Sequence, residues 1–176
     1  MKINKKKTEV MMFTASRKFD FPPELKFADQ TNVQTTSEKL LLGVVITDDL
    51  KWKRNTEFIV SKAKRKILIL RRLIHLNLSI YDLYDVYTKE IRSLLEFAVP
   101  VWHPSLTRKQ SRNIEAVQKL AFRIILRNTY TDYNHACATF RTETLEQRRR
   151  YLCLNFAKKN LKVKIAYSLG QLTEKT

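Results

Sequence analysis

The chain has 176 residues, of which 44% are hydrophobic, enough for one ordinary domain with a core and too many for a disordered tail. It carries 34 Lys and Arg against 17 Asp and Glu, a formal net charge of +17. So basic a chain favours polyanionic partners, either nucleic acid or an anionic membrane surface. The longest apolar runs, LLLGVVI and ILIL, are far shorter than the roughly 20 residues of a spanning helix, so no membrane segment is expected.

The first fifty residues are predicted to form strands and turns. Short apolar or alternating stretches, TEVMMF, ELKFAD, NVQT and KLLLGVVIT, are separated by FPP and by Thr, Asn and Ser clusters. Beyond Trp52 the apolar periodicity becomes helical, and Gly43 and Gly170 are the only glycines. We therefore expect an α+β chain that is mostly α, with a β segment at 1–52, a helical thumb-like domain at 53–165 and a tail at 166–176.

Five helices are predicted. The first covers about 53–76, and the second begins at Ser79, with Asp82 in its first turn, and is expected to end at Pro100. The third begins at Thr107, which forms a capping-box pattern with Gln110. A short helix at 132–140 and a longer one at 143–162 follow. The expected buried stripes are Ile59, Ala63, Ile67, Leu70 and Ile74 on the first, Ile80, Leu83, Tyr87, Ile91, Leu94 and Ala98 on the second, and Ile114, Val117, Ala121 and Ile124 on the third.

Basic side chains occupy the other faces of these helices. Neutralising phosphates with Lys and Arg gives strong binding that is indifferent to sequence. Successive helical residues turn by about 100°, so we expect two of Arg148, Arg149 and Arg150 to reach phosphate, and a solvated or acid-paired face is the alternative. The candidate nucleic-acid contacts are Lys62, Arg65, Lys66, Arg72, Arg112, Lys119, Arg123, Arg127, Arg148 and Arg149.

Other residue types are expected to be structural. Cys137 and Cys153 are too few for a disulfide framework and indicate a reduced, intracellular chain with ordinary buried thiols. His135 and Cys137 would need two more ligands to hold a metal, so no metal site is predicted. Seven aromatic residues could stack on bases, but core packing is favoured for them: Tyr81, Tyr84, Tyr87, Phe97, Trp102, Phe122 and Phe156.

The order of several motifs resembles one family. N-x-x-K-T at residues 4–8, LLGVVIT, the pair Leu50 and Trp52, LLEFAVPVW, IEAVQKLAFRIIL and TLEQRRRYL follow one another along almost the whole chain. Together they are similar to the end of the palm and the thumb of reverse transcriptases from jockey-like non-LTR retrotransposons. The resemblance implies template-primer RNA, DNA or RNA–DNA hybrid as partner, together with the palm and fingers of an intact polymerase.

The resemblance also implies roles for three N-terminal residues. Lys7 would lie nearest the phosphates of the incoming nucleotide, and the alternative is a surface lysine. Leu42 and Gly43 would belong to a strand near the primer end, where Gly43 lets backbone approach nucleic acid. A tight turn or a packed strand is an equal alternative for Gly43.

No catalytic residue is expected in this chain. Asp48 and Asp49 are adjacent, as the metal-binding aspartates of a reverse transcriptase are, but they follow the N-x-x-K-T motif, whereas the family's pair precedes it. A solvated turn before a helix is the better interpretation. We expect no cofactor for this chain alone, Mg²⁺ only in an intact polymerase, and a truncated reading frame that starts at an internal methionine.

Two hypotheses remain open. The first is a nucleic-acid-binding fragment of a reverse transcriptase that is inactive by itself, in the nucleus or cytoplasm. The second is a helical protein-interaction or structural remnant without a nucleic-acid role.

The chain departs from the family's pattern at the end of the third helix. The family places a glycine there and this chain has Arg127 and Asn128, so Asn128 is expected to take the left-handed position.

Overall fold

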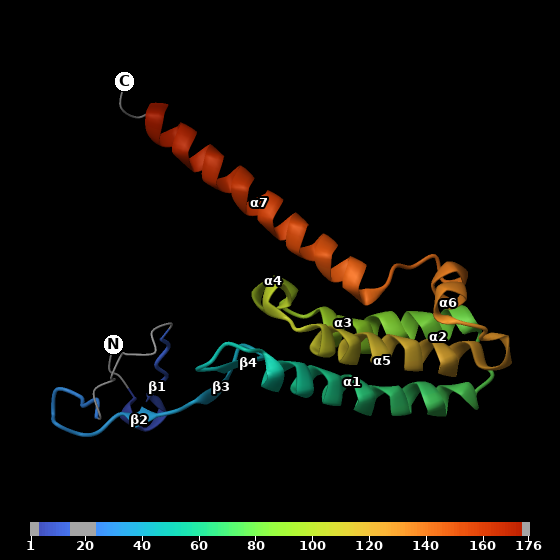
Figure 1. Cartoon of the computed structure of the whole chain (residues 1–176), viewed down its shortest axis with the longest axis horizontal. Coiled ribbons are helices and arrows are strands. Elements are labelled where there is room, and N and C mark those ends of the chain that lie inside the picture. The colour runs from blue at the N-terminus through green and yellow to red at the C-terminus, as the bar shows by residue number, and fades with distance from the viewer. Residues whose placement is uncertain (1–3, 15–23, 174–176) are drawn as a thin grey trace. The chain divides into compact units, whose positions relative to one another are not determined.

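The computed structural model describes residues 4–14 and 24–173, with side chains up to Leu161, and divides the chain into two compact units, Met1–Asn55 and Thr56–Thr176 (Figure 1). The expected α+β class, mostly α with short N-terminal strands, is confirmed. Along the chain, the boundary between the two units lies three residues beyond the predicted end of the β segment. The boundary therefore falls within the first turn of the first long helix.

The N-terminal unit contains two small sheets. A short 3₁₀ turn, η1 (Lys5–Lys7), precedes β1 (Glu9–Val10), which pairs in parallel with β2 (Gln34–Thr35). Strands β3 (Glu38–Leu41) and β4 (Val44–Thr47) form an antiparallel hairpin in which Leu41 faces Val44. Lys26 and Asn32 make an isolated bridge, so ELKFAD does not form a longer strand among the described residues.

The LLGV stretch contains the tight turn that joins β3 to β4. Leu42 and Gly43 both have positive φ, 47° and 86°, as the two central residues of a two-residue hairpin require. The tight-turn alternative for Gly43 is therefore confirmed. The hairpin is joined to the first turn of the next helix, because Val45 N–H donates to Asn55 Oδ1 at 3.1 Å and Arg54 pairs with Glu38.

The second unit is helical and is built around α5 (Arg108–Leu126), which contacts α2 (Ile80–Val86), α6 (Tyr133–Thr139) and α7 (Leu145–Thr173). The remaining long helix is α1 (Lys53–Ile74). Thr107 caps α5 with the predicted capping box, and Ser79 caps α2 by accepting from Asp82 N–H at 3.2 Å. No helix in residues 4–14 and 24–173 is both long and apolar enough to cross a bilayer.

A π-helical segment, η2 (Tyr87–Arg92), follows α2 and leads into α3 (Ser93–Glu96). The expected stripe is wrong beyond it: Leu95 and Val99 are fully buried, one residue later than the predicted Leu94 and Ala98. A π turn holds more residues than the 3.6 of an α-helix, so it moves the buried face along the sequence by one position. The buried positions consequently recur every fourth residue: Leu83, Tyr87, Ile91, Leu95 and Val99.

Pro100 does not end the second helix, which is a further correction. The break comes at Phe97 and Ala98, where Ala98 adopts the left-handed conformation with φ 51° and ψ 29°. Pro100 lies inside the short helix α4 (Val99–Trp102), in its first turn, where a proline leaves no helical bond unmade. Trp102 is fully buried, and its Nε1–H donates to Phe97 O at 2.9 Å across the break. The turn η3 (His103–Ser105) connects α4 to α5.

Two predicted helix ends also differ from the structure. Arg127, with φ 50°, takes the positive-φ position after α5, whereas Asn128 lies inside the 3₁₀ turn η4 (Arg127–Thr129). The last helix continues to Thr173 instead of ending near residue 162, so it includes most of the expected tail. The first and third buried stripes are confirmed except at their ends, where Ile74 is half-buried and Ile125 is buried in preference to Ile124.

Replacing Ala98 with glycine should stabilise the helical unit. A left-handed backbone costs an L-residue roughly 1 kcal/mol that glycine avoids, so Ala98→Gly should raise the free energy of unfolding by up to about 1 kcal/mol in urea denaturation. The same substitution at the exposed Ala116 of α5 should lower it by about 1 kcal/mol. Equal decreases in the free energy of unfolding at both positions would contradict the left-handed conformation of Ala98.

Candidate nucleic-acid interface

Four cationic side chains form a stripe along the outer face of α5. Arg108, Arg112, Lys119 and Arg123 are exposed and lie four, seven and four residues apart. At about 100° per residue these spacings keep all four within a narrow sector, opposite the buried residues Ile114 and Ala121. We call these four residues the α5 stripe.

Two hollows flank the α5 stripe. One, of about 620 Å³, lies between α1 and α5 and is lined by Thr56, Glu57, Val60, Ser61, Lys64, Arg65, Leu68, Asn113 and Ala116. The other, of about 500 Å³, lies between α5 and the start of α7 and is lined by Arg108, Ser111, Arg112, Glu115, Ala116, Lys119 and Glu146. Ala116 lines both, so a small side chain separates them and the stripe stands above a grooved surface.

Most acidic residues of the helical unit form ion pairs or hydrogen bonds with other residues of the same unit. Between Thr56 and Leu161 there are twenty Lys and Arg but nine Asp and Glu. Glu90 pairs with Lys66 at 2.8 Å, Asp85 with Lys89 at 2.5 Å and Glu96 with Arg148. Asp132 caps α6 by accepting from two backbone amides. Few carboxylates are therefore left to neutralise the α5 stripe.

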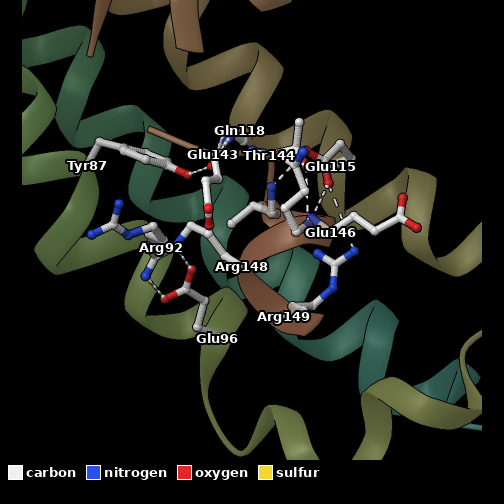
Figure 2. A network of polar contacts seen from close by, with 12 residues as sticks. Tyr87, Arg92, Glu96, Glu115, Gln118, Glu143, Thr144, Glu146, Arg148 and Arg149 are labelled. Carbon is white, nitrogen blue, oxygen red and sulfur yellow. Dashed lines mark hydrogen bonds and ion pairs between the residues drawn. The ribbon is translucent and has the colours of Figure 1, made fainter. Parts of the chain in front are cut away.

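Glu115 is the most heavily used of these acids (Figure 2). It lies on α5 but caps α7, because its carboxylate accepts from Leu145 N–H at 2.9 Å and Glu146 N–H at 3.1 Å. The hydroxyl of Tyr133 donates to the same carboxylate. A carboxylate at a helix N-terminus satisfies orphan amides and interacts favourably with the positive end of the helix dipole, so this contact stabilises the start of α7.

A chain of polar contacts continues from Glu115 through the core. Gln118, which is fully buried, donates from Nε2 to Tyr133 Oη at 2.7 Å and to Glu143 O at 3.2 Å. Its Oε1 accepts from the buried Tyr87 hydroxyl at 2.5 Å. Burial raises the pKa of both tyrosines, and at Tyr133 the hydrogen bond to Glu115 raises it further, so both hydroxyls keep their protons and act as donors.

The structure buries Arg149, which corrects its assignment as a phosphate contact, and it pairs Arg148 with an acid, the alternative considered above (Figure 2). Arg148 forms a bidentate pair with Glu96, and Nη2 lies 2.9 Å from Oε2. Arg149 is fully buried, donates to Ser111 Oγ at 2.8 Å and lies 3.9 Å from Glu115. Because the guanidinium of Arg149 has no exposed surface, it cannot reach a phosphate, whereas Arg148 is partly exposed and Arg150 is exposed.

The remaining predicted contacts are distributed over several faces. Lys66 is half-buried and paired with Glu90, and Lys62 Nζ lies 4.4 Å from the ring centroid of Phe58. Neither lysine lines the two hollows that flank the α5 stripe. Arg127 donates to Ile74 O at 3.1 Å and ties the ends of α5 and α1 together. Arg65 and Arg72 are exposed on α1. Lys7, Leu42 and Gly43 are exposed in the N-terminal unit.

Two members of the interface were not predicted. Arg108 belongs to the α5 stripe and Lys64 faces the hollow between α1 and α5. Arg108 lies four residues before Arg112, so the helical period contained the signal. Lys64 could not be distinguished from Lys62 and Lys66 without knowing which side of α1 faces α5.

Aromatic residues divide between core and surface. Tyr84, Tyr87, Phe122 and Phe140 form the aromatic core, where Tyr84 stacks on Phe140 at 4.4 Å between centroids. Tyr130 and Tyr133 instead lie beside the α5 stripe. The ring centroid of Tyr130 is 5.5 Å from Arg123 Cζ, and that of Tyr133 is 4.9 Å from Lys119 Nζ. The core interpretation is wrong for three of the seven predicted aromatics, Tyr81, Phe97 and Phe156, which are at least half exposed.

Asp48 and Asp49 lie in a solvated turn, as expected. Asp49 accepts from Lys51 N–H at 3.1 Å and from the Thr47 hydroxyl at 2.8 Å, and these bonds lower the pKa of its carboxyl. Over residues 4–14 and 24–161, no three His, Cys, Asp or Glu side chains gather closely enough to hold a metal ion.

Comparisons with models of known families, with curated proteins and with solved structures found no significant match to this chain.

Removing the Glu115 carboxylate should destabilise the helical unit strongly. Glu115→Ala leaves Arg149 buried with Ser111 as its remaining partner and leaves the amides of Leu145 and Glu146 without theirs, so the free energy of unfolding should fall by about 3 kcal/mol in urea. The exposed Glu143→Ala is the control and should change it by less than about 0.5 kcal/mol. Similar values for both variants would contradict the capping role.

Proposed function

We propose that this chain binds the phosphate backbone of RNA, DNA or an RNA–DNA hybrid without sequence preference, through the face formed by the α5 stripe and the exposed cations of α1. The observation that supports the proposal is the α5 stripe itself, in which four cations project outward while Glu115, the acid beside them, is bonded internally. Lys64, Arg65 and Arg72 extend this positive surface onto α1.

Counterion release would supply most of the binding free energy. Each phosphate neutralised by Lys or Arg releases condensed counterions, so roughly six contacts on a duplex give a log–log salt slope near −5. Positions four residues apart on α5 are separated by about 6 Å along the helix axis, a spacing at which several cations can follow one backbone. Arg123 and Lys119 are held by Tyr130 and Tyr133, which limits their motion.

We further propose that the chain corresponds to the palm-end and thumb of a jockey-like non-LTR retrotransposon reverse transcriptase, in which it would grip template and primer. The ordered motifs from N-x-x-K-T to TLEQRRRYL support this proposal. On this proposal the catalytic aspartates and their Mg²⁺ belong to other parts of the polymerase, the chain alone does not extend primers, and the protein acts in the nucleus or cytoplasm.

A helical protein-interaction role is the second candidate. One observation favours it: α7 leaves four large hydrophobic side chains, Tyr151, Leu154, Phe156 and Leu161, between 57% and 59% exposed. A contiguous patch of exposed apolar side chains commonly marks an interaction site, and Tyr151, Leu154 and Leu161 lie within about 80° of one another around α7. In that case the basic face would contribute charge without forming a nucleic-acid site.

Neutralising three of the four residues of the α5 stripe should reduce both the affinity for nucleic acid and its salt dependence. In fluorescence anisotropy with an RNA–DNA hybrid, the triple variant Arg112→Gln, Lys119→Gln and Arg123→Gln should bind at least tenfold more weakly at low salt, and its slope should be shallower by about one unit per residue removed.

The matched control removes three positive charges elsewhere, by Arg141→Gln, Lys158→Gln and Lys159→Gln, all exposed and away from α5. This control variant should keep most of the affinity for the hybrid and most of the salt slope. If the two triple variants weaken binding equally, the net charge of the chain rather than the α5 stripe is responsible and the proposed site is wrong.

A further inference from the structure

We propose that the hollow between α5 and α7 is a binding site for a phosphate monoester, namely the terminal phosphate of a nucleic-acid strand; this inference rests on the proposed function. The hollow of about 500 Å³ receives cationic side chains from three positions of one helix, Arg108, Arg112 and Lys119. We call it the α5–α7 hollow.

The cations of the α5–α7 hollow are not matched by free acids. Two carboxylates line it, from Glu115 and Glu146. Glu115 is committed to Tyr133 and to the amides of Leu145 and Glu146. Those amides are therefore not available to an anion, and the site does not depend on the helix N-terminus. Glu146 is exposed at the rim and opposes anion binding modestly.

A buried arginine lies behind the wall of the hollow. Arg149 donates from Nη2 to Ser111 Oγ at 2.8 Å, while its Nε and Nη1 are buried and have no hydrogen-bond partner within residues 4–14 and 24–161. Because Ser111 lines the hollow and its oxygen accepts from Arg149, the hydroxyl proton is free to donate into the hollow. An arginine stays charged at neutral pH, so Arg149 adds positive potential without touching the ligand.

The charge balance selects a dianion. Three cations line the α5–α7 hollow and Arg149 lies behind its wall, against two lining carboxylates, so the local excess is two positive charges. A phosphate monoester carries about −1.5 to −2 at pH 7, whereas a backbone diester carries a single charge. Arg108 and Arg112 can each offer a planar pair of donors to phosphate oxygens. The hollow between α1 and α5 has a smaller excess and an apolar wall from Val60 and Leu68, so it does not show the same preference.

The test compares one single-stranded RNA sequence carrying a 5′-phosphate, a 3′-phosphate or hydroxyls at both ends, by fluorescence anisotropy at pH 7.5 and moderate salt. We expect one phosphorylated form to bind the wild-type chain about tenfold more tightly than the hydroxyl form. Inorganic phosphate should compete with that form alone. At pH 5.5 the advantage should shrink, because the second pKa of a phosphate monoester is about 6.

Two double variants locate the effect. Arg108→Gln with Arg112→Gln should abolish the preference, whereas the matched Lys64→Gln with Arg65→Gln should weaken all three RNAs and keep the preference. Equal binding of the three RNAs by the wild-type chain, or a preference that survives Arg108→Gln with Arg112→Gln, would overturn the inference while the proposed function stands. Failure of the wild-type chain to bind any of the RNAs, or the RNA–DNA hybrid, would overturn both.

Discussion

The carboxylate of Glu115 is the contact on which the arrangement of the helical unit depends. It projects from α5, receives the first amides of α7 and the hydroxyl of Tyr133, and lies near the buried Arg149. Its charge is therefore used inside the unit, where it positions α7. The outward face of α5 remains cationic, so this interaction both positions α7 and withdraws the Glu115 carboxylate from the α5 stripe, where the exposed Glu146 is the acid that remains nearby.

The polar chain that begins at Glu115 explains how the core keeps a single arrangement. Gln118 has donors and an acceptor that are all engaged, and its bond with Tyr87 extends the network to η2. A buried network of this kind is stabilising only when its members are satisfied, so it disfavours any sliding of α5 against its neighbours. Side chains on α5 that face outward are consequently held in a constant register with η2, α6 and α7.

Features set by local chemistry could be predicted from the sequence. The caps at Ser79 and Thr107 depend on residues three positions apart. The helical period places Arg112, Lys119 and Arg123 on a common face, whereas Arg127, expected on the same face, lies beyond the end of α5 and bonds to Ile74 O. The buried positions after η2 could not be predicted, because a π turn changes the period and nothing in a composition pattern indicates it.

Tertiary partners account for the remaining differences. In the sequence, Arg148 and Arg149 resemble surface arginines, because their partners Glu96, Ser111 and Glu115 are distant along the chain and become neighbours only in the fold. Arg127 takes the positive-φ position that Asn128 would be expected to hold, and its side chain bonds to Ile74 of α1. In each case a contact across the fold decided the role of the residue.

The central claim is that the grooved surface of α5, rather than the net charge of the chain, binds nucleic acid. Ala116 lines both hollows and is exposed, so Ala116→Trp places a bulky side chain on the grooved surface without changing any charge. Affinity for an RNA–DNA hybrid should fall at least tenfold, while the same substitution at the exposed Ala138 of α6 should leave it unchanged. Unchanged affinity in Ala116→Trp, with the fold intact by circular dichroism, would contradict the account.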